Sequence, residues 1–178
     1  MNPLPIDRYD PVARWLHWAM AVLLIGMVGS GFYATSLTYY DPWYHRSVFW
    51  HRSFGVAVFA VAWLRLGWRL GHPAPPFPAA SPAWERLAAT WTHRMLYLLM
   101  ILLPITGYLI STADGRGVSV FGWFELPALL EPDKDRASWM GRIHLGAAVS
   151  LGALVLLHVA AAFKHHLIDR DGTLRRMW

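Results

Sequence analysis

Residues 139–166 read WMGRIHLGAAVSLGALVLLHVAAAFKHH. Residues 143–163 hold no aspartate, glutamate, lysine or arginine, yet they include His144 and His158. Such an apolar run predicts a membrane-spanning helix, in which ionisable side chains are rare unless they have a function. The two histidines are 14 residues apart, so on a helix they share one face and lie about 21 Å apart along its axis. The stretch therefore suggests two metal centres stacked across a membrane.

The composition of the whole chain also favours a membrane protein. Of its 178 residues, 56% are hydrophobic and 15% are charged, and the mean hydropathy is +0.31, which is unusual for a soluble domain. The net charge of +5 does not indicate a nucleic-acid partner, because the basic residues are scattered between apolar runs. The chain has no cysteine, which excludes disulfides, iron–sulfur clusters and covalent attachment of c-type haem. Any haem must be held non-covalently.

The apolar runs predict a single membrane domain over residues 1–178 with four spans. The first span follows basic residues, as a signal peptide would, but it lacks a convincing small-residue cleavage site, so we expect it to stay uncleaved. The proline-rich run 71–78 cannot continue a helix and marks a loop. The polar connection 114–142 includes Phe121, Trp123 and Phe124 and is expected to lie against the membrane surface. The expected spans are residues 15–36, 47–69, 93–113 and 140–166.

The basic residues predict the orientation of these spans. The N-terminal segment, the second loop with its flanking helix ends, and the C-terminal segment together carry ten basic residues against five acids. The other side carries six of each. By the positive-inside rule, both termini are expected in the cytoplasm. The expected location is the inner membrane of a bacterium, with several passes through the bilayer.

Five histidines then fall at two depths of the predicted bundle. His17, His93 and His158 are expected near the cytoplasmic surface, and His51 and His144 near the other surface. Two axial histidines suit a haem that transfers electrons, because they close both iron positions. The pairs that would span the bundle are His51 with His144 and His17 with His158. Zinc is the alternative, but imidazole-only zinc sites need three or four convergent ligands, and no His-Glu-x-x-His motif occurs.

Two histidine positions keep more than one interpretation at this point. His93 is compatible with replacing His17 as a ligand, with donating to a haem propionate, or with lining a substrate pocket. His165 follows His158 by seven residues, about 10 Å further along the helix, where a quinone headgroup can meet a haem edge. The alternative is that His165 and His166 only anchor the helix end among lipid headgroups.

Arginines surround the outer histidine level. Haem propionates need cationic partners of this kind, and the same field can steer an anionic substrate. We therefore expect Arg52 and Arg142 to be propionate partners.

These residues together resemble the bacterial cytochrome b561 family, di-haem four-helix membrane proteins that include superoxide oxidases. The likeness covers nearly the whole chain, and the ordered set of histidines is more specific than any one motif. The residues that carry it are Leu16-His17-Trp18, His51 with Gly55, Arg65 and Arg69 before His72-Pro-Ala-Pro-Pro76, Thr92-His93, Leu103-Pro104 with Gly107, His144, Leu157-His158 before three alanines, His165-His166, and finally Asp171-x-Thr173-Leu174-x-Arg176-Met177.

The resemblance implies an all-α integral membrane bundle of four helices that encloses two b-type haems. His17 and His158 would be the axial ligands of the cytoplasmic haem iron, and His51 and His144 those of the outer one. It further implies that electrons pass from superoxide on the periplasmic side to ubiquinone. By the same analogy, His165 is a quinone contact, with His166 beside it, and Arg116 is part of a cationic entrance. The alternative function is a cytochrome b subunit that relays electrons from a partner dehydrogenase or other periplasmic donor to the quinone pool.

Overall fold

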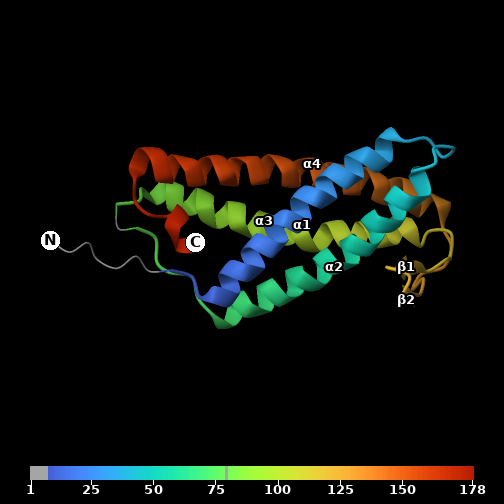
Figure 1. The fold of residues 1–178 in the computed structure, drawn as a ribbon, viewed down its shortest axis with the longest axis horizontal. Coiled ribbons are helices and arrows are strands. Elements are labelled where there is room, and N and C mark those ends of the chain that lie inside the picture. Colours follow the sequence, from blue (N-terminus) through green and yellow to red (C-terminus); the bar gives the residue numbers. More distant parts are fainter. Residues whose placement is uncertain (1–7, 79) are drawn as a thin grey trace.

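The computed structural model describes residues 8–78 and 80–178, and over these residues the chain forms a bundle of four long helices (Figure 1). All four are long and apolar enough to cross a membrane, by length and composition. The all-α membrane bundle expected from the sequence is therefore confirmed. Residues 1–7 and 79 of the expected domain lie outside the described residues. The helices are α1 (Pro11–Ser36), α2 (Tyr44–Gly71), α3 (Ala83–Ser111) and α4 (Lys134–Lys164).

All four helices begin before the apolar spans that the sequence indicates, and a carboxylate caps the start of two of them, α1 and α4. The Asp10 carboxylate accepts from the backbone N–H of Ala13 at 3.0 Å, and Pro11 occupies the first helical position, where its missing N–H costs nothing. Asp133 caps α4 in the same way by accepting from two backbone N–H groups. Hydropathy thus indicates the part of each helix that suits a membrane, whereas the caps of α1 and α4 fix where these two helices start.

The two ends of the bundle are formed by different segments of the chain (Figure 1). α1 packs along α2, α3 packs along α4, and α2 also contacts α3. Because successive helices alternate in direction, the starts of α1 and α3 and the ends of α2 and α4 gather at one end, together with the C-terminal segment. We call this the tail end. The opposite end, which carries the link between α3 and α4, is called the hairpin end.

The link between α3 and α4 contains a small antiparallel hairpin, which the sequence pattern does not predict. Its strands are β1 (Val118–Val120) and β2 (Phe124–Leu126). Phe121 and Gly122 form the turn with positive φ angles of 53° and 73°. The backbone N–H of Phe121 donates to Ser53 Oγ of α2 at 3.0 Å, and the Ser53 side chain is fully buried. The hairpin is therefore fixed against the first half of α2.

The C-terminal segment folds back over the tail end. After α4 the chain makes one π-helical turn, η1 (His165–Asp169), and then a 3₁₀ turn, η2 (Leu174–Met177). The carbonyl of Met177 accepts from Trp18 Nε1 at 2.9 Å, and the carbonyl of Arg176 accepts from the N–H of Tyr9 at 3.1 Å. π-Helical turns are rare and often occur at functional sites.

A layer of buried apolar side chains crosses the middle of the bundle. Met20, Val58, Ala62 and Met100 form one cluster and are at most 5% exposed. Leu151 of α4 is also buried, and it lies seven residues from both His144 and His158. The histidines at the two ends are therefore separated by apolar packing.

Candidate functional site

Two histidines face each other at the hairpin end. His51 lies in the second turn of α2, and His144 lies in α4. Their ring centroids are 6.3 Å apart, and the ring planes are nearly perpendicular at 73°. Both side chains are half-buried. The structure thus brings together the outer pair that the sequence suggested.

Hydrogen bonds fix the tautomer of both rings. Ser30 Oγ donates to the carbonyl of Met27 at 3.1 Å, so its oxygen accepts from Nδ1 of His51, 3.0 Å away. Nδ1 of His144 lies 2.9 Å from Thr106 Oγ1 and 3.1 Å from the carbonyl of Leu103. Each ring therefore carries its proton on Nδ1 and leaves the lone pair of Nε2 free. Metal-bound histidines typically show this arrangement, since the bond at the second nitrogen orients the ring and strengthens the ligand.

Glycines lie directly beside both of these rings. A Cβ atom built on Gly31 would lie 3.1 Å from Cε1 of His51, and one on Gly107 would lie 3.3 Å from Cε1 of His144. Any larger residue at either position would press on the ring and turn it. The two glycines therefore preserve the orientation of the facing imidazoles.

Three histidines gather at the tail end. His17 of α1 and His158 of α4 have ring centroids 6.1 Å apart with 58° between their planes. His93 of α3 lies closer to His158, at 5.3 Å and 69°. His158 thus has two possible partners, and the sequence had left this choice open.

Arg65 of α2 distinguishes the tail end from the hairpin end. Its Nη2 lies 3.0 Å from Nδ1 of His17, its Nε donates to the hydroxyl of Tyr97 at 3.2 Å, and its Nη1 donates to the carbonyl of Leu16. Because an arginine only donates, Nδ1 of His17 accepts, and the neutral ring carries its proton on Nε2. Arg65 thus joins α2 to α1 and α3 through its guanidinium group.

The donor sets fit axial binding of a haem iron. Metal–imidazole bonds are about 2 Å long, so two imidazoles on opposite faces of one metal have ring centres about 6 Å apart. His51 with His144 meets this separation and presents free Nε2 lone pairs. His17 with His158 also meets it, but Arg65 must release Nδ1 before Nε2 of His17 can bind a metal. The 5.3 Å separation of His93 and His158 is short for a shared iron.

The basic residues at the hairpin end differ in their surroundings. Arg52 lines a cavity of about 200 Å³ together with Asp114 and Lys134. Arg142 is exposed and its guanidinium lies over the ring of Trp139, 4.2 Å from the centroid. Arg116 forms a 2.5 Å ion pair with Asp114 on the surface, and its hydrogen bonds lower the pKa of the Asp114 carboxyl from 3.8. Of the three arginines considered from the sequence, Arg52 is the one that lines a cavity.

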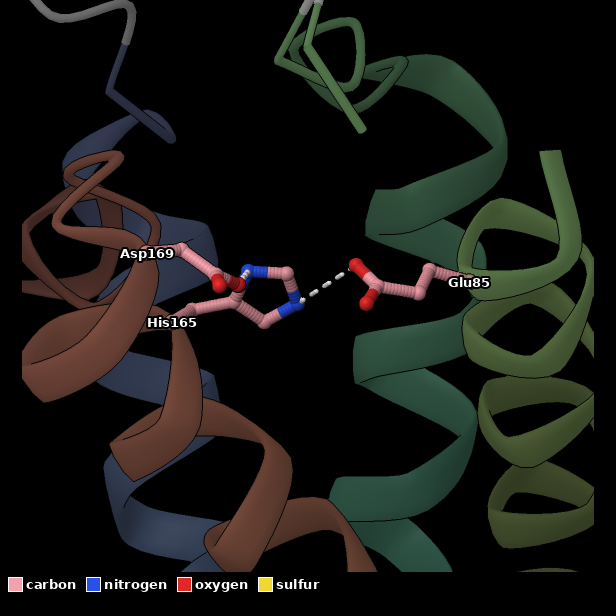
Figure 2. A group of neighbouring side chains, drawn as sticks. All are labelled: Glu85, His165 and Asp169. Carbon is pink, nitrogen blue, oxygen red and sulfur yellow. Dashed lines mark ion pairs between the residues drawn. The ribbon is translucent and has the colours of Figure 1, made fainter. Parts of the chain in front are cut away.

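A polar cluster lies beyond His158 at the tail end. Figure 2 shows the imidazole of His165 between the carboxylates of Asp169 and Glu85. Nδ1 of His165 lies 3.0 Å from Asp169 Oδ2, and Nε2 lies 3.8 Å from Glu85 Oε2. Glu85 belongs to the first turn of α3, and its side chain is only 11% exposed. His166 follows in the same π-helical turn and is half-buried.

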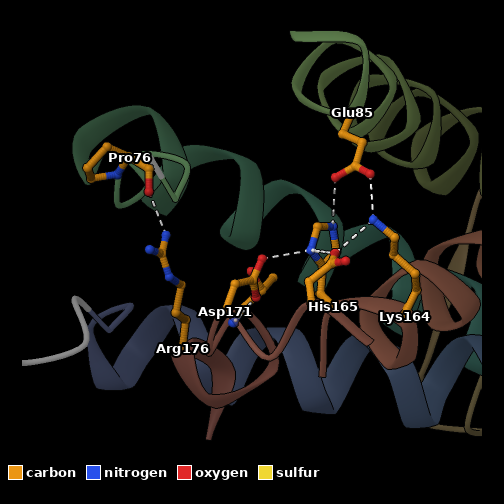
Figure 3. A network of polar contacts seen from close by, with 8 residues as sticks. Pro76, Glu85, Lys164, His165, Asp171 and Arg176 are labelled. Atoms are coloured by element: carbon orange, nitrogen blue, oxygen red, sulfur yellow. Dashed lines mark hydrogen bonds and ion pairs between the residues drawn. The ribbon is translucent and has the colours of Figure 1, made fainter. Parts of the chain in front are cut away.

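Lys164 and Asp171 complete this cluster (Figure 3). Lys164 Nζ lies 2.5 Å from Glu85 Oε1 and 2.7 Å from Asp169 Oδ2. Asp171 Oδ2 lies 2.7 Å from Nδ1 of His165. Burial alone would raise the pKa of Asp171, but hydrogen bonds from Thr173 and His165 outweigh it, and the net shift is downward from 3.8. The carboxylate of Asp171 is therefore ionised at neutral pH.

The same cluster has a composition that is compatible with a metal ion. Glu85, His165 and Asp169 offer ligand atoms that all lie within 4.8 Å of one another. However, the ammonium group of Lys164 already lies between the two carboxylates and supplies the positive charge that a cation would bring. We therefore interpret this cluster as a network of ion pairs and hydrogen bonds rather than as a metal site.

Several of these residues escaped sequence reasoning. Ser30 and Thr106 bind histidine Nδ1 atoms, but no motif marks them for this role. Arg65 and Asp171 belong to the residues that carry the family resemblance, but their contacts with His17 and His165 appear only in the fold. Glu85 offered a signal, because it is the sole acid in the amphipathic stretch 84–94 that leads into α3.

Comparisons with known proteins identify the family of the chain. The family model for prokaryotic cytochrome b561 matches residues 8–178. Cytochrome b561 homolog 2 of Escherichia coli (strain K12) is 42% identical over 172 residues, which cover 96% of this chain and 91% of that protein. The probable superoxide oxidase CybB of Yersinia pestis is 32% identical over 175 residues, covering 96% and 95%. Cytochrome b561 homolog 1 of Escherichia coli (strain K12) is 27% identical over 176 residues, covering 97% of each chain.

Proposed function

The chain belongs to the prokaryotic cytochrome b561 family, and on that premise we propose that it oxidises superoxide at the hairpin end and reduces ubiquinone at the tail end. Membership implies b-type haem and membrane electron transfer. The named activity of the relative from Yersinia pestis supports superoxide as the donor. In this reaction two superoxide anions each lose one electron and become oxygen, while one quinone gains two electrons and two protons and becomes quinol.

We assign one haem to each histidine level. His51 and His144 would hold the iron at the hairpin end, and His17 and His158 the iron at the tail end. A bound haem would supply at each place an iron that accepts and passes one electron at a time. The ring separations of 6.3 and 6.1 Å support both assignments. His93, close to His158 but without the separation of an axial pair, would line the tail-end haem.

The charge distribution supports the direction of transfer. The tail end carries the excess of basic residues, so the positive-inside rule places it in the cytoplasm and the hairpin end in the periplasm of the inner membrane. Arg52, beside His51 in sequence and lining the cavity at this end, would attract a superoxide anion or hold a haem propionate. Arg116 contributes less to an anionic approach, because Asp114 neutralises it.

The cluster around His165 supports the tail end as the quinone site. A quinone that receives electrons there also needs protons, and an imidazole is the side chain best suited to deliver them near neutral pH. The 19% exposure of the His165 side chain leaves it accessible at the end of α4. Its partners belong to α3, η1 and the C-terminal segment.

The observation that carries this proposal is the pair of facing histidines at each end. It is tested by giving superoxide to the purified protein in detergent and measuring quinol formation from a soluble ubiquinone. We expect quinol to form faster than superoxide dismutates, with two superoxide anions consumed for each quinol. A protein that takes up both haems and accepts electrons only from a separate dehydrogenase would contradict this proposal and support the electron-relay alternative.

A further inference from the structure

We propose that Glu85 and His165 form a proton-transfer pair that supplies the quinone with protons, and that Asp171 holds the imidazole in the orientation this transfer needs. The inference rests on the proposed function, because it takes the quinone to bind beside His165. It adds two residues, Glu85 and Asp171, and gives each a distinct task.

The two ring nitrogens of His165 have different partners. Nδ1 lies 2.7 Å from Asp171 Oδ2 and 3.0 Å from Asp169 Oδ2, and an ionised carboxylate can only accept. Nδ1 therefore carries a hydrogen and donates it. Nε2 becomes the nitrogen that gains and loses the mobile proton, as in catalytic sites where an aspartate orients a histidine.

Glu85 faces that second nitrogen. Its Oε2 lies 3.8 Å from Nε2, while its Oε1 is bound by Lys164 Nζ at 2.5 Å (Figure 3). The gap exceeds a hydrogen bond by about 1 Å, so a small side-chain movement closes it. Lys164 is the most exposed member of the cluster, at 39%, and opening its bond to Glu85 exposes the carboxylate to cytoplasmic water.

The charges of the cluster favour uptake of a proton. Three carboxylates, from Glu85, Asp169 and Asp171, face one ammonium and one imidazole (Figure 3). With a neutral imidazole, three negative charges oppose one positive charge. One added proton leaves three against two, and it reduces the unbalanced charge in a poorly hydrated place. The cluster can thus store a proton until the quinone needs it.

Each proton reaches the quinone through His165 and is then replaced through Glu85. The Nε2–H bond of the His165 imidazolium breaks as a quinone oxygen takes its proton. The carboxylate of Glu85, once Lys164 releases it, takes a proton from cytoplasmic water and passes it to the vacated Nε2, which restores the imidazolium and leaves Glu85 ionised again. A second cycle provides the second proton, while both electrons come from superoxide at the hairpin end.

A purely structural role for Glu85 makes a different prediction. Glu85 also ties α3 to α4 through Lys164, and a glutamine at this position keeps an oxygen that accepts from the ammonium. Glu85→Gln therefore preserves the tie but cannot carry a proton. Glu85→Asp keeps a carboxyl group that can. Glu131→Gln makes the same change in charge on the exposed surface of the hairpin end and serves as the matched control.

The kinetic test mixes reduced holoprotein with a soluble ubiquinone and follows haem oxidation against pH, in water and in deuterium oxide. We expect Glu85→Gln to slow oxidation about 100-fold, the lower end of what a positioned proton donor contributes, and to change the pH profile and the isotope effect. Glu85→Asp should recover most of the rate, and Glu131→Gln should match the wild type. If Glu85→Gln keeps the wild-type rate, pH profile and isotope effect, the pair is overturned. If even the wild type is not oxidised by quinone, the proposed function falls and the pair with it.

A second measurement does not depend on the stability of a Glu85 variant. The chain has three glutamates, Glu85, Glu125 and Glu131, so Glu85 is the sole glutamate in the Glu125→Gln/Glu131→Gln protein. With ¹³C-labelled glutamate, infrared difference spectra recorded on quinone addition should show a change in the protonation of this carboxyl group. Absence of any labelled carboxyl signal in this protein would overturn the role of Glu85.

Discussion

The hairpin end and the tail end both bring histidines into facing pairs, yet they surround them differently. At the hairpin end, Nδ1 of each ring donates to a hydroxyl or carbonyl oxygen, and Nε2 is ready for a metal. At the tail end, Arg65 donates to Nδ1 of His17, a third histidine is present, and an acidic cluster follows. If the proposed function holds, the difference teaches that the electron-accepting site at the hairpin end needs only fixed ligands, whereas the quinone site at the tail end needs groups that can change hydrogen-bond partners.

The sharpest way to separate the two ends is to remove one ligand from each. His144→Ala should abolish haem reduction by superoxide, because the hairpin-end iron is the point of entry. His158→Ala should leave that first reduction intact but abolish quinol formation. Stopped-flow spectra of the two variants after mixing with superoxide measure both steps. If His158→Ala instead abolishes haem reduction by superoxide and His144→Ala abolishes only quinol formation, electrons enter at the tail end and the proposed direction is wrong.

The tail-end pairing is decided by comparing His17→Ala with His93→Ala. We expect His17→Ala to lose the tail-end haem and His93→Ala to retain both haems, because the His93–His158 separation is short for a shared iron. Haem content per protein, measured after denaturation in alkaline pyridine, checks this. A haem lost from His93→Ala and kept in His17→Ala would make His93 the ligand.

The hydrogen bond at histidine Nδ1 should contribute more to haem affinity at the hairpin end than at the tail end. Thr106→Val removes the hydroxyl that accepts from His144 and should weaken the hairpin-end haem about 10- to 100-fold, as loss of such partners does at other metal sites. Arg65→Gln removes a bond that opposes metal binding by His17, so we expect a change of less than about tenfold at the tail end. Haem transfer to apomyoglobin measures both affinities. Equal losses would mean that Arg65 supports the bound state after all.

Acidification should lower the stability of the folded protein slightly, because carboxylates at both ends lose their hydrogen bonds when they are protonated. Hydrogen bonds from Ala13, Thr38 and Arg116 lower the pKa values of Asp10, Asp41 and Asp114 from 3.8, and that of Asp171 is also lowered. Their stabilisation is therefore present above the unfolded value near 3.9 and is lost as the pH falls through the folded values. Asp171→Asn should lower Tm at pH 7 by less than about 3 °C and reduce the loss between pH 5 and 3. Thermal melts in detergent across this pH range measure Tm. If Asp171→Asn loses as much Tm between pH 5 and 3 as the wild type, Asp171 does not contribute to the acid sensitivity.

The bundle and its facing histidines were accessible from sequence because hydropathy and helical spacing act over long, regular stretches. A long apolar run indicates which part of a helix lies within the membrane. The spacing of His144 and His158 alone places them on one face of their helix. The facing of His51 and His144 followed from placing four alternating helices. These inferences needed no knowledge of side-chain contacts.

The rest of the site depended on tertiary contacts that leave no periodic signal. The hairpin at residues 118–126 is short, and its position depends on contacts with α2, which include the bond from Phe121 to the buried Ser53 and the packing of the Phe121 ring beside Phe54. The π-helical turn at His165 and the return of Asp171 depend on how the C-terminal segment packs on α1. The partners of the histidine Nδ1 atoms come from neighbouring helices, so helical packing rather than local sequence selects them.

The central claim is that each end of the bundle holds one haem between its own pair of histidines. It is tested most directly by counting haem b in the wild type and in two double variants, His51→Ala/His144→Ala and His17→Ala/His158→Ala. The account predicts two haems in the wild type and one in each double variant, with different spectra for the two that remain. A wild type with a single haem, or a double variant that keeps both, would contradict it.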